Sequence, residues 1–113
     1  MMNKFSAKRC EYKGKIFDSK AERDRFIYLN ALQKQGKISD LVWQKKFLII
    51  DGMRENGVLV ERPVYYIADF VYFKDGKMVV EDVKGCKSGS VYRLFVLKRK
   101  LMLQRYGIRV REV

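Results

Sequence analysis

The dipeptide Asp75-Gly76 is the sequence feature that most restricts how this chain folds. It follows an apolar, β-rich segment at residues 58–73 and precedes another at residues 78–83. Asp-Gly suits the positive φ values of a type I′ turn, so we expect a tight β-hairpin. A loop of two or of four residues pairs the strands in the same register, in which Asp69 lies opposite Asp82.

Two carboxylates and a lysine share one face of this predicted hairpin. Because side chains alternate along a strand, Asp69 and Asp82 point to the same side, with Cβ atoms about 5 Å apart. Lys84 follows Asp82 by two residues and shares that face, whereas Glu81 points to the other side. An odd-length loop or a β-bulge would exchange the faces of Glu81 and Asp82, so Glu81 is the alternative acid.

Carboxylates placed opposite each other favour a bound divalent cation. Like charges at such positions destabilise a sheet, and a cation removes that cost. Carboxylate oxygens and water suit Mg²⁺, which polarises a phosphoryl oxygen and lowers the pKa of a bound water. Lys84 would then orient or help to deprotonate the attacking water, or balance charge in the transition state. The alternative is a salt-bridge cluster in which Lys84 only neutralises Asp69 and Asp82.

The charge of the chain indicates a polyanionic partner. It carries 25 Lys and Arg against 13 Asp and Glu, a formal net charge of +12 in 113 residues. A field of this sign attracts nucleic acid, and a protein that is merely basic is the alternative. The absence of histidine excludes Ser-His-Asp triads and His-metal nucleases. Cys10 and Cys86 belong to no C-x-x-C pair, which excludes a structural zinc site of the usual composition.

Helix and strand signals predict one α/β (α+β) domain over residues 1–113, with a basic arm or a short hairpin at residues 1–18. Ser19-Lys20-Ala21-Glu22 is a capping box that begins a helix running to about Gln35, with Gly36 after it. The other expected elements are a strand pair or one bent strand at 41–50, strands at 58–73 and 78–83, a helix at 91–106 closed by Gly107, and a strand at 108–113. The order is α-β-β-β-α-β, a mixed central sheet flanked by helices, in which the second helix connects two strands that can lie parallel.

Two segments resemble the signature of the PD-(D/E)XK nucleases, the restriction-endonuclease-like superfamily. They are Tyr66-Ile67-Ala68-Asp69-Phe70 and Val79-Val80-Glu81-Asp82-Val83-Lys84-Gly85, in which Asp69 is the first acid and Asp82-Val83-Lys84 the (D/E)-x-K element. Phe17-Asp18-Ser19-Lys20-Ala21-Glu22 is similar to a segment that opens the first helix in small phage-encoded members. The resemblance runs from about residue 8 to the end, and the layout is similar to that of Holliday-junction resolvases and transposon-end endonucleases. Ala68 replaces the proline of the superfamily name.

The resemblance implies roles for further residues. Glu22 would be a third acid that reaches the metal from the first helix, with helix capping as its alternative role. The acid-x-lysine spacing favours Asp82 over Glu81 as the second acid. Lys98 would lie near the site or the DNA backbone, or else be a solvated lysine. Basic residues after Lys84 and on the second helix would contact DNA phosphates: Lys87, Arg93, Lys98, Arg99 and Lys100.

Together these features predict a Mg²⁺-dependent DNA endonuclease in which Mn²⁺ substitutes for Mg²⁺. The resemblance implies a 5′-phosphate product and a place in phage DNA metabolism, whereas the small basic core favours structure-selective cutting of branched DNA. Paired cuts at a Holliday junction would require a homodimer. We expect a cytoplasmic protein, because residues 1–5 lack the apolar stretch of a signal peptide. We expect no membrane association, because no apolar run reaches the roughly 18 residues needed to span a bilayer, and no nucleotide cofactor. The alternatives are a non-catalytic nucleic-acid-binding module on the same fold and an unrelated basic interaction protein.

Overall fold

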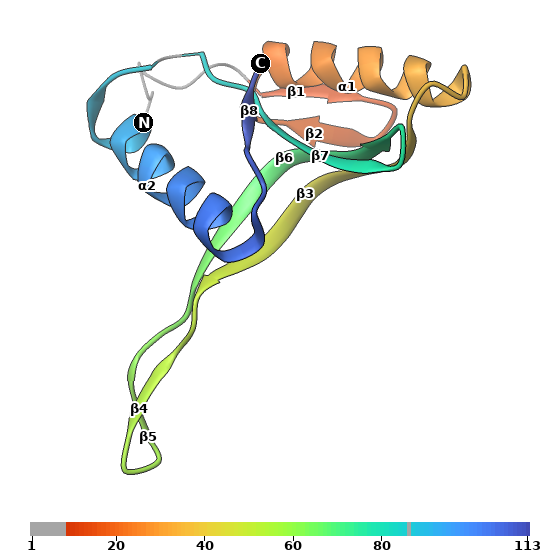
Figure 1. Ribbon diagram of the computed structural model, residues 1–113. Helices are drawn as coiled ribbons and strands as arrows, with labels where there is room; N and C mark the ends of the chain where they lie inside the picture. Colours follow the sequence, from red (N-terminus) through yellow and green to blue (C-terminus); the bar gives the residue numbers. More distant parts are fainter. Residues whose placement is uncertain (1–8, 86) are drawn as a thin grey trace.

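The computed structural model describes residues 9–85 and 87–113. Its centre is a mixed four-stranded sheet in which the strands lie side by side in the order β3, β6, β7, β8 (Figure 1). Strands β3, β6 and β7 are antiparallel, and β8 is parallel to β7. The bounds of these strands are Ser39–Ile50 for β3, Val64–Lys74 for β6, Lys77–Asp82 for β7 and Arg111–Glu112 for β8.

Two helices, α1 (Lys20–Lys34) and α2 (Gly89–Tyr106), cover opposite faces of this sheet. Val71 and Val80 belong to the hydrophobic cluster that contains residues of α2. Phe70, the neighbour of Val71, belongs to the cluster that contains residues of α1. Side chains of β6 and β7 therefore pack against α1 on one face of the sheet and against α2 on the other, in two separate hydrophobic cores. A mixed α+β fold was predicted and is confirmed at this level of detail.

The Asp75-Gly76 turn has the predicted geometry. Asp75 has φ 52° and Gly76 has φ 76°, and the pairing of Lys74 with Lys77 closes a two-residue loop. The register continues to the pair Phe70 and Glu81. Asp69 and Asp82 are the next residues in this register, as the turn predicted.

Local signals set the ends of both helices. Ser19 caps α1, because its hydroxyl accepts a hydrogen bond of 3.1 Å from the backbone N–H of Glu22. Gly36, after α1, has φ 75°. Gly107 ends α2 with φ 68°, a left-handed conformation that glycine adopts without steric cost. Helix α2 begins at Gly89, slightly before the start predicted at residue 91.

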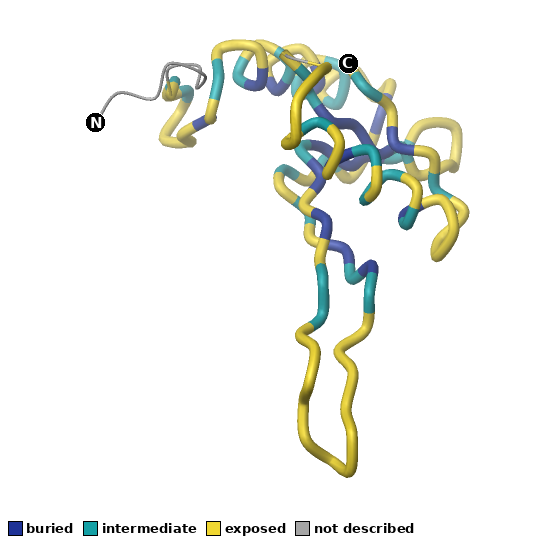
Figure 2. Tube along the Cα trace, turned by 90° about the vertical axis from the view of Figure 1, so that its left-hand side faces the viewer, coloured by how far each residue is buried: buried dark blue, intermediate teal, exposed yellow. Residues whose placement is uncertain are grey.

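Two hairpins are added to the predicted order of elements. Strands β1 (Cys10–Tyr12) and β2 (Lys15–Phe17) form the hairpin considered for the N-terminal arm, whose residues 1–8 lie outside the described part. Strands β4 (Met53–Glu55) and β5 (Val58–Glu61) form a ribbon that projects from the body (Figure 1) and is exposed along its whole length (Figure 2). The β-rich segment predicted at 58–73 is therefore two strands, β5 and β6, rather than one. It divides before Pro63, which has no N–H to donate to a ladder.

The last strand is shorter than the predicted segment 108–113. Only Arg111 and Glu112 pair with β7, and Val113 N donates to Asp82 O at 3.0 Å. Helix α2 thus connects the parallel strands β7 and β8 across one face of the sheet. Within the described residues, no helix has the length and apolar composition needed to cross a membrane.

Candidate active site

Three carboxyl groups from three different elements lie near one another where the inner strand β7 ends. Glu22 lies in the first turn of α1, Asp69 lies on β6 and Asp82 ends β7. The carboxyl group of Asp69 lies close enough to those of Glu22 and Asp82 for each to raise its pKa through their charges. The backbone N–H of Val83 also donates to Asp69 Oδ2 at 2.8 Å. The predicted pairing of Asp69 with Asp82 thus brings the two side chains together, and α1 adds a third acid.

Burial makes this acidic cluster costly to ionise. Burial, followed by the charge of Asp82, raises the pKa of Asp69 to about 8. Burial, followed by the charges of Asp18 and Asp82, also raises the pKa of Glu22. Glu22 Oε1 is buried, and no hydrogen-bond donor reaches it from the described residues. The carboxyl group of Glu22 thus lies toward Asp69, while its backbone N–H serves the helix cap.

A lysine and a tyrosine hold the carboxylate of Asp82. Lys84 Nζ lies 2.9 Å from Asp82 Oδ1 and 3.9 Å from the centre of the Phe95 ring on α2. The hydroxyl of Tyr66 donates to Asp82 Oδ2 at 2.5 Å. Burial and the charge of Asp82 raise the pKa of Tyr66, so this hydroxyl stays a donor. Both oxygens of Asp82 therefore have partners.

Tyr66 is the site residue that sequence reasoning missed. Strict alternation places Tyr66 and Asp69 on opposite faces, because they are three residues apart. The alternation breaks near Asp69, since Ala68 and Val71 belong to the same hydrophobic cluster. Gln44, between the two β3 residues that pair with Phe70 and Ala68, has φ 57°, which is unusual within a strand. No spacing in the sequence predicts this break in the alternation of side chains along β6.

Glu81, the alternative acid, lies on the other face of the sheet. Its carboxylate is fully buried and accepts hydrogen bonds of 2.9 Å and 2.7 Å from Nε and Nη2 of Arg25 on α1. The hydroxyl of Tyr72 also donates to it. This bidentate pair joins α1 to β7 and leaves Asp82, rather than Glu81, in the acidic cluster.

An open cavity of about 300 Å³ lies beside the acidic cluster. Asp69, Asp82 and Lys84 line one part of it, and Lys98 of α2 lines another. Lys98 is therefore close to the site, as one of its two predicted roles required. The rest of the lining is aromatic or aliphatic: Tyr65, Tyr66, Ile67, Val91, Leu94 and Phe95.

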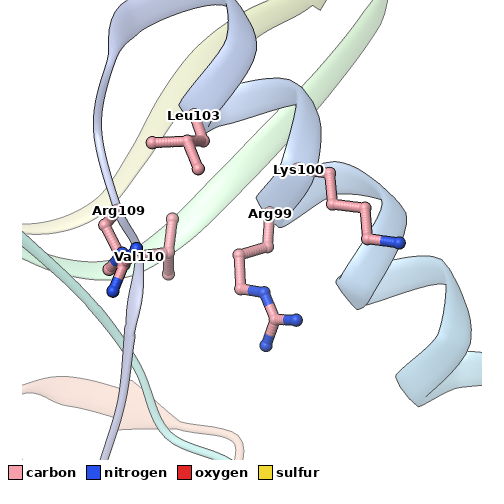
Figure 3. Close-up of a pocket in the computed structure, with 5 residues that line it drawn as sticks. All are labelled: Arg99, Lys100, Leu103, Arg109 and Val110. Carbon is pink, nitrogen blue, oxygen red and sulfur yellow. The ribbon is translucent and has the colours of Figure 1, made fainter.

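The other predicted DNA-binding residues do not share this cavity. Arg99 and Lys100 line a second cavity of about 370 Å³ (Figure 3), together with Arg109, which the sequence reasoning did not select. Arg99 Nη1 also lies 2.8 Å from Glu112 Oε2, and Lys87 lies 3.9 Å from Glu112 Oε1. Arg93 is exposed on α2.

The donor chemistry of the acidic cluster suits a hard divalent cation. Glu22, Asp69 and Asp82 supply only carboxylate oxygens, the ligands that Mg²⁺ prefers, and Glu22 Oε1 has no donor to satisfy it within the described residues. Within residues 9–85 and 87–113, no three Asp, Glu, His or Cys side chains are arranged so that they could hold a metal ion without moving. The ammonium group of Lys84 is the cation beside Asp82 in this arrangement.

Comparison with known proteins gives one match. A family model described as "Protein of unknown function (DUF1064)" matches residues 2–111. The comparisons with curated proteins and with solved structures give no significant match.

Proposed function

The chain belongs to the DUF1064 family, and we propose that it is a metal-dependent DNA endonuclease with Glu22, Asp69, Asp82 and Lys84 at its active site. The observation that carries this proposal is the convergence of three carboxyl groups and a lysine, of which Asp69, Asp82 and Lys84 line one open cavity. A purely structural cluster would place each acid against a basic partner, as Glu81 is placed against Arg25. In the acidic cluster, Asp82 is paired with Lys84, but no ion pair of the described residues includes Glu22 or Asp69. Buried acids that lie close together in this way cost stability and are typical of functional sites.

The fold proposed for this function is the restriction-endonuclease-like core. Its support is the pair Asp82 and Lys84 at the end of an inner strand, opposite Asp69, within a mixed sheet covered on both faces. The net charge of +12 supports DNA as the partner, because a field of this sign attracts the phosphate backbone.

Glu22, Asp69 and Asp82 would hold Mg²⁺, or Mn²⁺ in its place. When bound, the cation supplies Lewis-acid polarisation of the scissile phosphate and offsets the charge of the carboxylates. Tyr66 keeps the carboxylate of Asp82 in one orientation through its hydrogen bond. The helix cap at Ser19 holds the first turn of α1, and with it Glu22, beside β6.

Lys84 is the residue of this chain that acts on the reacting groups. Asp82 and the Phe95 ring hold its ammonium group at the cavity. From there it donates a hydrogen bond to a non-bridging phosphate oxygen and stabilises the charge that develops in the transition state. Water attacks phosphorus, the bond from phosphorus to the 3′ oxygen breaks, and the leaving oxygen takes up a proton. The products are a 5′-phosphate and a 3′-hydroxyl.

Branched DNA is the substrate class that we propose, as in the resolution of Holliday junctions during phage DNA metabolism. Such a substrate requires two cuts placed symmetrically, and a homodimer supplies two active sites related by a two-fold axis. The basic cavity formed by Arg99, Lys100 and Arg109 offers a second contact for the phosphate backbone.

A cleavage assay tests this proposal. A labelled four-way junction, a linear duplex and a single strand are incubated with Mg²⁺, Mn²⁺ or EDTA. We expect metal-dependent cutting by the wild type, a rate at least about 10²-fold lower for Asp82→Asn, and an unchanged rate for Glu61→Gln on the exposed β5. Binding of these DNAs without cutting in any metal would support the second candidate function, a non-catalytic nucleic-acid-binding module on the same fold.

A further inference from the structure

One side of the active-site cavity is an exposed apolar wall. Tyr65 and Ile67 come from β6, and Val91 and Leu94 come from the first turns of α2. Their exposed fractions are 38%, 56%, 81% and 52%, respectively. The wall is continuous with Asp69, Asp82 and Lys84, because all of these residues line the same cavity. A group bound at the acidic cluster therefore has its neighbouring atoms against apolar side chains.

Basic side chains surround this wall. Lys46 of β3 places Nζ 4.1 Å from the centre of the Tyr65 ring. Lys98 of α2 lines the same cavity, and Lys84 lies at its acidic end. An aromatic ring flanked by lysines offers a stacking surface together with charge for a phosphate backbone. This combination differs from the second cavity, where the residues around Leu103 and Val110 are arginines and a lysine.

The occupant of the wall must carry both apolar and anionic groups. The outer surface of a paired DNA duplex is a row of phosphates, and its bases are stacked inside, out of reach of Tyr65. A nucleotide that has lost its pairing partner exposes the face of its base, which stacks on aromatic rings whatever its sequence. Such a nucleotide next to the scissile phosphate fills the apolar wall while the phosphate lies at Lys84.

We propose that Tyr65, with Ile67 and Leu94 beside it, binds an unpaired nucleobase adjacent to the phosphate that is cut. The site thereby selects DNA that is single-stranded, gapped or unpaired at a branch point. The cutting step rests on the nuclease activity proposed above, whereas the binding of the base is independent of it.

The test uses 2-aminopurine, a fluorescent base, placed beside a single-stranded gap and, as a control, within the same fully paired duplex. Measurements in EDTA prevent metal-dependent cutting. We expect the wild type and Tyr65→Phe to quench the fluorescence of the gapped DNA only, and Tyr65→Ala to lose the quenching. Tyr28→Ala is the matched control, because Tyr28 is an exposed tyrosine on α1 outside this cavity. Circular dichroism melts establish that each variant is folded.

A cleavage assay in Mg²⁺ completes the test. For Tyr65→Ala we expect the rate on gapped or branched DNA to fall about tenfold or more, while the rate on paired duplex changes little. Quenching that persists in Tyr65→Ala, or that is absent in the wild type, overturns the assignment. Self-association that Tyr65→Ala abolishes, without any effect on quenching, assigns the wall to a second copy of the chain instead. Quenching by a wild type that never cuts DNA refutes the nuclease and leaves the base-binding site in place.

Discussion

Tyr66 and Asp82, which lie on neighbouring strands, are joined by a buried hydrogen bond of 2.5 Å from the tyrosine hydroxyl to Oδ2 of the aspartate. This bond connects the hydrophobic cluster beneath α2 to the acidic cluster. Since Lys84 holds the other oxygen of Asp82, the carboxylate is fixed between two donors. The orientation of Asp82 therefore depends on a tyrosine as well as on Lys84.

Replacing Tyr66 with Phe should remove the donor and leave Asp82 Oδ2 without its partner. A hydrogen bond to a charged group contributes roughly 1.5–3 kcal/mol, so we expect the free energy of unfolding to fall by about that amount. Urea denaturation measures the change, with Tyr28→Phe on the exposed face of α1 as the control. A loss of less than about 0.5 kcal/mol would show that the bond does not hold the carboxylate.

Replacing Asp69 with Asn should stabilise the metal-free protein more at high pH than at low pH. The pKa of Asp69 is about 8 in the folded chain and about 4 in an unfolded chain. The protonated carboxyl group stabilises the fold at low pH, and this stabilisation is lost as the pH rises through the folded pKa. The Tm difference between Asp69→Asn and wild type, measured in EDTA, should therefore grow between about pH 5 and about pH 9. Asp75→Asn, at an exposed turn, controls for the loss of one charge, and an equal difference at both pH values would contradict the argument.

Replacing Arg25 with Ala should destabilise the fold strongly. Among the described residues, the substitution leaves the fully buried carboxylate of Glu81 with the Tyr72 hydroxyl as its one side-chain partner, and an uncompensated buried charge is costly. Because the Arg25 side chain is 27% exposed, we expect a loss of roughly 2–4 kcal/mol rather than the full cost of a buried pair. Chemical denaturation measures it against Arg23→Ala, whose ion pair with Asp24 is exposed. Similar losses in the two variants would refute a structural role for Arg25 and Glu81.

Replacing Arg109 with Ala should weaken DNA binding without changing substrate preference. Arg109 is exposed at the second cavity (Figure 3), which we proposed above as a second contact for the phosphate backbone. Loss of one phosphate contact lowers the slope of log affinity against log salt by about 1, equally for junction and duplex. Fluorescence anisotropy across a salt series measures this slope, and Arg54→Ala on β4 is the control. An unchanged slope would place the DNA elsewhere.

Much of the candidate site follows from local chemistry in the sequence. Asp75-Gly76 specifies a two-residue turn, and the turn specifies that Asp69 and Asp82 are opposite each other. The Ser19 cap specifies where α1 begins, so Glu22 falls in its first turn. These are interactions between residues close in sequence, which backbone geometry controls.

The tertiary structure decided what local patterns left open. Glu22 had two candidate roles, and the packing of α1 on the sheet turned its carboxyl group toward Asp69. Tyr66 reached Asp82 only because alternation fails along β6, and Arg25 reached Glu81 across 56 residues of sequence. The position of α2, which brings Phe95 and Lys98 to the cavity, likewise depends on packing. A turn or a cap is determined by a few neighbouring dihedral angles, whereas contacts between distant segments depend on how whole elements fill the core, which no short stretch of sequence encodes.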